Sequence, residues 1–204
     1  MAQHSKKELR RDMKVVLANL DKRWAAKANA EVCSQLRELV LSFGDSPAPR
    51  HVFAWVPCFP GEIDLGMFIG EMLKSSNVYL PKLDAAGSMS FVRVYDDWAS
   101  RLSAGYRGII QPQEGYGEPF VADGVGQIVV IVPGVAFDTT GRRLGRGAGH
   151  YDRFLSSSAM RGATKIGVCW SMQLVSDVPV DSFDINMDWV CHERGALRVD
   201  GGNQ

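Results

Sequence analysis

The chain has 204 residues, of which 46% are hydrophobic, enough to build the core of one domain without disulfide support. Lysine plus arginine and aspartate plus glutamate both number 23, so no overall field favours nucleic acid or an anionic membrane. The N-terminal sequence has no apolar signal core, and no run approaches the ~18 apolar residues of a membrane span, so we expect a cytoplasmic protein.

Two amphipathic helices are predicted first. Ser5 and Glu8 have the spacing of a capping box, and the apolar stripe that follows predicts a helix over 5–20. A second stripe predicts a helix over 32–43, ended by Gly44 and a proline-containing loop.

The next segments predict strands around one further helix. A β-rich run covers 51–56, and the loop CFPGEID leads from it to a predicted helix over 64–74, capped by Asp64. Short strands are predicted over 77–81 and 88–94. The polar, glycine-rich segment that follows is predicted to be a long loop lining a site, over 96–126.

The last part of the chain predicts buried strands and a short helix. The run QIVVIV, over 127–132, reads as a strand covered on both faces. A helix is predicted around Tyr151, and strands are predicted over 165–170 and 187–192, before a frayed tail from Asp200. Helices that alternate with apolar strands predict an α/β fold, a three-layer sandwich with a mostly parallel sheet, in one domain over 1–204.

The four cysteines are widely spaced along the chain. They form no CxxC pair and no zinc-ligand spacing with histidine, which argues against a zinc site and against a secreted disulfide framework. We expect buried, reduced thiols at Cys33, Cys58, Cys169 and Cys191.

The segment PGVAFDTTGRRLGRGAGHYDRFL, from Pro133, combines five glycines with four arginines directly after a predicted strand. Ligands of open α/β sheets bind beyond the carboxyl ends of strands, where this segment begins. Its glycines let the backbone approach a ligand, and its arginines offer forked donors that suit phosphate. The pattern predicts an anion site, although a glycine-rich turn with solvated arginines is the simpler alternative. A Walker A motif is absent, and His150 stands where a GxGxxG motif needs its last glycine.

The string PGxAFDxxGxRLGRGxGxYDRFL resembles the signature of the 5-formyltetrahydrofolate cyclo-ligase family, also called 5,10-methenyltetrahydrofolate synthetases. The resemblance continues in KxxxR from Lys6 to Arg10, in VPCFPGEID with Glu62, in NVYLPKL and GIIQP, and in MDWV with Asp188. It implies ATP-dependent, Mg²⁺-requiring closure of 5-formyltetrahydrofolate to 5,10-methenyltetrahydrofolate, with release of ADP and phosphate. It also implies the fold of phosphosugar isomerases and CoA-transferases, the NagB/RpiA/CoA-transferase-like fold.

The resemblance also implies roles for particular residues. Arg146 and Tyr151 are the expected catalytic residues, because one would neutralise the migrating phosphoryl group and the other would donate to developing charge. Mg²⁺ would be held by Asp152 and Asp188. The folate substrate would be bound by Pro57, Glu62, His150 and Tyr151. The ATP site would comprise Lys6, Arg10, Arg143, Leu144, Gly145, Arg146, Gly147, Ala148, Gly149, His150 and Tyr151.

Each of these residues also has a simpler reading. Asp152 would complement a helix dipole, Asp188 and Glu62 would be surface acids, and Tyr151 would pack beneath the loop. Lys6 and Arg10 would be the solvated side of a helix, and tryptophans such as Trp55 and Trp170 would be core rather than stacking partners of pterin or adenine.

Two positions depart from the family pattern. Ala148 stands where some members carry lysine, so a lysine contact to phosphate is missing there. His150 stands where the family usually has tyrosine or phenylalanine, so we expect altered ligand stacking or pH dependence with activity retained.

Two other functions stay open at this point: a phosphosugar isomerase-like enzyme on the same fold, and a non-catalytic folate- or nucleotide-binding relative. The expected partners are a small-molecule substrate but neither nucleic acid nor a membrane, and the expected state is a monomer.

Overall fold

The computed structural model describes residues 5–44, 49–122 and 126–199, built around helices and a central sheet. The helices are α1 (Lys6–Ala18), α2 (Lys22–Ser42), α3 (Gly66–Leu73) and α4 (His150–Leu155). The strands are β1 (Arg50–Phe53), β2 (Ser76–Leu83), β3 (Met89–Val94), β4 (Leu102–Ala104), β5 (Ile110–Pro112), β6 (Ile128–Pro133), β7 (Ala136–Phe137), β8 (Arg143–Leu144), β9 (Thr164–Val168), β10 (Trp189–His192) and β11 (Gly195–Arg198).

Seven strands form the main sheet, in the order β11-β10-β9-β6-β1-β2-β3. The five inner strands are parallel, whereas β3 and β11 run antiparallel to their neighbours at the two edges. The predicted α/β fold with a mostly parallel sheet is therefore confirmed. A closer kinship with phosphosugar isomerases stays a prediction.

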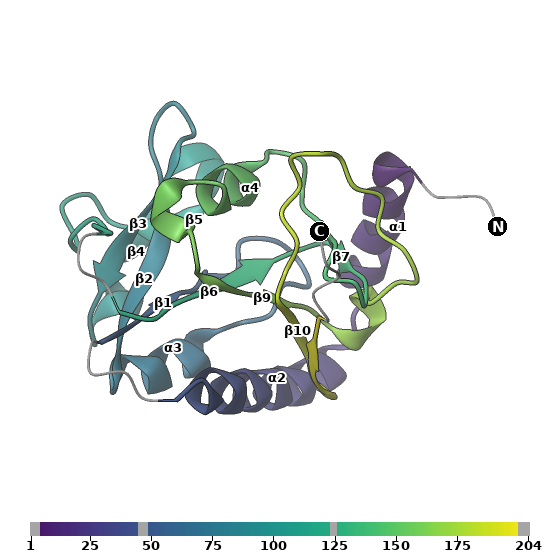
Figure 1. Cartoon of the computed structure of the whole chain (residues 1–204), viewed down its shortest axis with the longest axis horizontal. Helices are drawn as coiled ribbons and strands as arrows, with labels where there is room; N and C mark the ends of the chain where they lie inside the picture. The colour runs from purple at the N-terminus through teal and green to yellow at the C-terminus, as the bar shows by residue number, and fades with distance from the viewer. Residues whose placement is uncertain (1–4, 45–48, 123–125, 200–204) are drawn as a thin grey trace.

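Helices cover both faces of this sheet, with α2 and α3 on one side and α4 on the other (Figure 1). Successive strand residues point to opposite faces, so Val52 packs in the core beneath α2 and α3 while Phe53 packs in the core on the α4 side. At one end of the molecule α1 packs beside the two-stranded sheet of β7 and β8 (Figure 1). Among the described residues, no helix has the length and apolar character needed to cross a bilayer.

Local signals explain where the helices begin. The predicted capping box of α1 is present, because Ser5 N–H donates to Glu8 and the Glu8 N–H donates back to the Ser5 hydroxyl. Helix α3 begins two residues later than predicted, with Leu65 rather than Asp64 as its N-cap residue, although Asp64 does accept a hydrogen bond from the backbone of Gly66. Helix α2 begins ten residues before the predicted stripe, since Asp21 caps it and an alanine-rich turn without an apolar stripe follows.

Several strands differ from the prediction. Strand β1 ends at Phe53 rather than at residue 56, because the chain turns away toward the cavity beyond this point. The predicted long loop contains the β4–β5 hairpin, and the exposed edge strand β11 was missed because its alternating sequence is too short and polar to stand out. The predicted tail and parts of the loops at 45–48 and 123–125 lie outside the described residues.

The strand order determines where a ligand can bind. From β1 the chain proceeds to β2 on one side, whereas β6 leads to β9 and β10 on the other. Connections that leave adjacent strands in opposite directions open a crevice at the carboxyl ends of these strands. The segments that follow β1 and β6 therefore diverge from a common point, and residues 133–155, called the Gly/Arg segment below, begin there.

Two glycines let the Gly/Arg segment fold back onto the sheet. The ring of Phe137, on β7, lies between Gly134 and Gly167. A Cβ atom at Gly167 would come within 2.4 Å of this ring, and a Cβ at Gly134 within 2.5 Å. Side chains are thus excluded at both positions by packing, and the fully buried Phe137 anchors the segment.

We predict that Gly167→Ala lowers the free energy of unfolding by about 1–3 kcal/mol, since the methyl group overpacks a closed core. Urea unfolding followed by circular dichroism measures this. The matched control is Gly70→Ala in α3, where a Cβ meets nothing within 4 Å and helix propensity should add about 0.5–1 kcal/mol. Equal stability of the two variants would contradict the assignment.

Candidate active site

A cavity of about 380 Å³ lies beyond the carboxyl ends of β1, β2 and β6, where the strand order predicts a crevice. Segments far apart in sequence surround it: the start of α1, the loop after β1, β2 and β3 with the turn before β5, the Gly/Arg segment and residues 181–184. Every predicted site residue lines it except Pro57, which lies between the lining residues Val56 and Cys58, and Asp188.

One wall of the cavity is apolar. Its side chains come from the loop after β1, from β2 and β3, and from the turn before β5: Trp55, Val56, Pro81, Leu83, Met89 and Ile109. The buried side chain of Gln111 fixes this wall, because it pairs with both the N–H and the C=O of Leu83. A flat, largely apolar ligand portion would be desolvated here.

Another part of the cavity lining is a turn of backbone with free donors. In the described chain, the backbone N–H groups of residues 145–149 donate to no other backbone group. Gly147 and Gly149 have φ of 104° and 66°, which favours glycine, and the Arg10 Nε donates to the Gly145 carbonyl over 2.8 Å. Helix α1 therefore holds the turn through its carbonyl side and leaves its N–H groups available to an anion.

Arg143 and Asp152 form a largely buried ion pair beneath this turn. The Arg143 Nη2 is 2.7 Å from the Asp152 carboxylate, and only 4% and 16% of the two side chains are exposed. The Arg143 Nη1 also donates to the Pro133 carbonyl at the end of β6. Breaking such a pair leaves a buried charge without compensation, so Arg143 acts as an anchor of the turn as well as a cation.

Lys6 connects α1 to the segment before β10. Its ammonium group contacts Asp181 at 2.7 Å and also contacts Asp184. Partial burial alone would lower the pKa of Lys6, but the hydrogen bonds to both carboxylates outweigh it and raise that pKa. Partial burial alone would raise the pKa of Asp184, but its hydrogen bond and charge pairing with Lys6 outweigh burial, so that pKa is lowered. Both groups are therefore charged at neutral pH.

Glu62 and Arg146, which both line the cavity, form an ion pair. The Arg146 Nε and Nη2 donate to one Glu62 oxygen over 3.1 and 2.9 Å, and the other oxygen accepts from the backbone N–H groups of Cys58 and Phe59. The Arg146 guanidinium also lies 3.8 Å from the centre of the Phe59 ring. Thus the loop after β1 and the Gly/Arg segment are joined by a charge pair.

Three buried donors around the cavity have no partner within the described chain: the Trp55 Nε1, the Arg143 Nε and the Tyr151 hydroxyl. Burial raises the pKa of Tyr151, partly opposed by Arg143, so its hydroxyl keeps its proton. Buried donors are normally satisfied, and leaving one unpaired costs about 1–3 kcal/mol. Three at one cavity indicate a ligand rich in acceptor atoms.

His150 is held by its neighbour Arg153. The Arg153 Nη2 is 3.1 Å from the His150 Nδ1, while its Nη1 donates to the Ala148 carbonyl over 2.9 Å. Arginine can only donate, so Nδ1 must accept and the ring proton lies on Nε2. Burial and the charge of Arg153 both lower the pKa of His150, which therefore lines the cavity as a neutral ring.

The two carboxylates predicted to hold Mg²⁺ are placed differently. Asp152 lines the cavity, whereas Asp188 precedes β10 and pairs with the backbone N–H and the ammonium group of Lys165, near the start of β9. Among the described residues, no group of three or more His, Cys, Asp or Glu side chains could hold a metal ion by itself. Asp184 does line the cavity with Asp152.

Trp170 is a core residue that supports the site. Its indole N–H donates to the Gly61 carbonyl over 2.7 Å, directly before Glu62, and its ring packs beside Trp24. Trp55, by contrast, lines the cavity itself. Of the two tryptophans singled out from the sequence, Trp55 therefore lines the site, whereas Trp170 supports the loop that carries Glu62.

Sequence reasoning missed Phe59, Asp181, Phe183 and Asp184, all of which line the cavity. Phe59 lies in the loop CFPGEID, three residues before Glu62. This short distance along the chain could have indicated that it belongs to the site. The three residues before β10 carried no such signal, because only the fold of the chain brings them beside α1.

Known proteins resemble this chain over its whole length. A family model described as the 5-formyltetrahydrofolate cyclo-ligase family matches residues 2–193. The 5-formyltetrahydrofolate cyclo-ligase of Saccharomyces cerevisiae is 27% identical over 209 residues, 95% of this chain and 97% of the relative. The Escherichia coli K12 protein of the same name is 32% identical over 138 residues, 66% of this chain and 74% of the relative.

Solved structures agree with these matches. The 5,10-methenyltetrahydrofolate synthetase of Aquifex aeolicus has a TM-score of 0.77 at 32% identity, with 98% of this chain and 95% of that chain covered. The Mycoplasma pneumoniae synthetase, at 20% identity and a TM-score of 0.70, covers 93% and 99% and supports the fold.

We predict that the pKa of His150 lies below its usual value of about 6.5, and that Arg153→Met raises it, because a nearby positive charge and the donor to Nδ1 are removed. An NMR titration of imidazole ¹⁵N shifts measures both the pKa and the tautomer, and His150→Gln assigns the signal among four histidines. Arg161→Met, at an exposed position, is the control. An unchanged pKa in Arg153→Met would refute this account.

Proposed function

The chain belongs to the 5-formyltetrahydrofolate cyclo-ligase family, and from this premise we propose how its cavity performs the ATP-dependent closure of 5-formyltetrahydrofolate to 5,10-methenyltetrahydrofolate. The observation that carries the proposal is the pairing of an apolar wall with a cationic turn whose backbone donors are free. A folate and a triphosphate need these two environments side by side.

The reaction has two steps in this proposal. The formyl oxygen attacks the γ-phosphorus of ATP, so that an O–P bond forms and ADP leaves. The folate N10 then attacks the formyl carbon and loses its proton, the C–O bond breaks, and phosphate departs. An amide oxygen is a poor leaving group, so phosphorylation makes it displaceable, and the protein contributes mainly by positioning and by neutralising charge.

The cationic wall would hold the triphosphate. Backbone N–H groups of residues 145–149 would bind phosphate oxygens, as expected for consecutive free donors. Lys6 and Arg146 would add charge from two sides, and Arg10 would keep the turn in shape through the Gly145 carbonyl. Ala148 lies in this turn, and its carbonyl accepts a hydrogen bond from Arg153. Because no lysine side chain is present at this position, Lys6 and Arg146 would supply the positive charge.

The apolar wall would hold the folate. Leu83, Met89 and Ile109 offer contact area for aromatic rings, and the Glu62 carboxylate would accept from the pterin's N–H groups. The unpaired hydroxyl of Tyr151 would donate to the charge that develops on the formyl oxygen. Neutral His150, with its proton on Nε2, would add a second donor instead of the phenol or phenyl ring usual in the family.

Mg²⁺ is the ion that the family implies. The carboxylates at the cavity fit this ion if Asp184 takes the place expected for Asp188. The ion usually takes one or two carboxylates and completes its shell with phosphate oxygens and water. Asp152 and Asp184 line the cavity and would hold the ion, whereas Asp188 forms an ion pair with Lys165. When bound, it would neutralise charge on the phosphates. Arg143 and Lys6, which now contact these two carboxylates, would orient them.

We also propose that the chain acts as one domain, because the family match covers residues 2–193. A cytoplasmic location, a monomeric state and the absence of nucleic-acid binding stay predictions.

We predict that Arg146→Ala lowers kcat by roughly 10²- to 10³-fold, the usual loss for one donor to a developing charge, while folate binding stays mostly intact. Absorbance of the methenyl product measures turnover, and calorimetry measures folate affinity. Arg142→Ala, from the same segment but outside the cavity and paired with Asp177, is the control. Equal loss of turnover and folate affinity would contradict the division of the site. Absence of both methenyl product and folate-dependent ATP consumption in the unchanged chain would favour the alternative functions.

We predict that Asp184→Asn raises the Mg²⁺ concentration for half-maximal activity by roughly 10- to 100-fold, whereas Asp188→Asn leaves it unchanged. Binding of Mn²⁺ in the presence of ADP, followed by electron paramagnetic resonance, provides a readout independent of turnover. Asp188→Asn should instead lower the free energy of unfolding by about 1 kcal/mol, because the backbone of Lys165 keeps only a neutral acceptor. The reverse pattern would restore Asp188 as the metal ligand.

A further inference from the structure

Arg146 is held by two side chains of the loop after β1. Its guanidinium donates twice to one oxygen of Glu62 and lies over the Phe59 ring, with its carbon 3.8 Å from the ring centre. Phe59 is 43% exposed as a residue and lines the cavity. The arginine expected at the phosphates is thus bound to the carboxylate expected at the pterin, and both assignments belong to the proposed function.

The acceptor capacity of Glu62 is fully used by these contacts. One oxygen accepts from the backbone N–H groups of Cys58 and Phe59 over 2.8 and 3.1 Å. The other accepts both bonds from Arg146 over 3.1 and 2.9 Å. A carboxylate offers about four acceptor sites, so donors of a ligand can reach Glu62 only when Arg146 leaves.

Glu62 itself cannot withdraw easily. The preceding Gly61 has φ of 77°, and a Cβ atom there would come within 2.4 Å of the Leu17 carbonyl on α1. The Trp170 indole donates to the Gly61 carbonyl from the buried core. Arg146, by contrast, is 39% exposed as a side chain and lies between two glycines, so the arginine is the partner that moves.

We propose that Phe59 is a positioning residue that keeps the Arg146 guanidinium at the cavity when folate donors replace it on Glu62. The ring face attracts the cation without using an N–H group, so all five donors become available to the triphosphate. Folate binding then frees Arg146 for nucleotide, and each ligand tightens the binding of the other by the same factor.

The size of the effect follows from the contact. A cation over an aromatic face gains about 0.5–2 kcal/mol depending on exposure, which corresponds to roughly 3- to 30-fold in a dissociation constant. Without the ring, the long side chain of Arg146 would be released to solvent once Glu62 is occupied. The loss should therefore be confined to the state in which folate is bound.

Titration calorimetry tests this with a non-hydrolysable ATP analogue, with and without saturating 5-formyltetrahydrofolate. In the unchanged chain we expect at least about 3-fold tighter nucleotide binding when folate is present. Phe59→Leu and Phe59→Met should weaken nucleotide binding roughly 3- to 30-fold with folate and leave it nearly unchanged without folate. Phe59→Tyr, which keeps an aromatic face, should retain the effect of folate.

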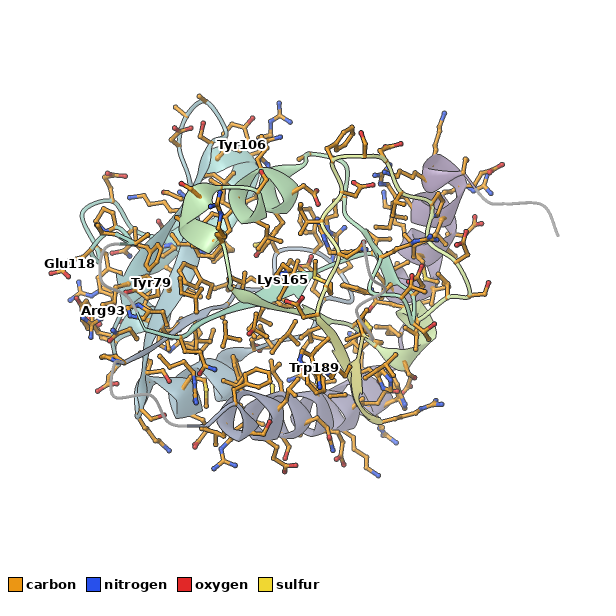
Figure 2. All side chains as sticks on the ribbon, in the orientation of Figure 1. Tyr79, Arg93, Tyr106, Glu118, Lys165 and Trp189 are labelled. Atoms are coloured by element: carbon orange, nitrogen blue, oxygen red, sulfur yellow. The ribbon has the colours of Figure 1, made fainter. Side chains whose placement is uncertain are left out.

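Tyr95→Leu is the matched control. Tyr95 is 40% exposed and lies under Arg93 at 5.4 Å, but it does not line the cavity. Figure 2 shows Arg93 at the end of the molecule opposite α1. This variant removes a comparable cation–aromatic contact and should leave both affinities unchanged.

The inference is overturned if both non-aromatic variants at Phe59 bind nucleotide as the unchanged chain does, or lose affinity equally with and without folate. Binding of both ligands without mutual strengthening would also overturn it, while leaving the proposed function intact. A chain that binds neither ligand would refute the proposed function and this inference together.

Discussion

The site depends on one constraint, the divergence of the chain at the carboxyl ends of β1 and β6. These strands are adjacent and parallel, yet the chain leaves them toward opposite sides of the sheet. Backbone hydrogen bonding between the two connections ends there, so the space must be filled by side chains or by a ligand. The loop that carries Glu62 and the segment that carries Arg146 face each other for this reason.

The positive charges at the cavity are compensated by carboxylates. Its main cations each meet a carboxylate: Lys6 meets Asp181 and Asp184, Arg143 meets Asp152, and Arg146 meets Glu62. Partly buried charges of one sign would repel and would lose solvation, so these pairs make the cavity tolerable before ligands arrive. In the proposed function, a polyanion with its metal ion would enter by exchanging partners rather than by creating charge in a dry site.

The family pattern located the cavity well because the signature segment is local. Gly145 to Gly149 are consecutive, and their backbone supplies the turn with its free N–H groups. Asp188 is different, and its role at Mg²⁺ stays a prediction. It lies four residues from Asp184, and only the pairing of Lys165 with Asp188 shows which of the two faces away from the cavity. Position along a chain does not state the direction of a side chain in an irregular segment.

The sequence by itself determined the α/β class, the capped first helix, the buried central strands and the glycine-rich turn, because each arises from periodicity or from contiguous residues. Only the tertiary structure decided that Arg146 rests on Phe59 and Glu62, that Lys6 reaches Asp181 and Asp184, and that Trp170 supports Gly61. These contacts join residues 84 to 178 positions apart, and such pairings follow from the strand order and packing rather than from any local pattern.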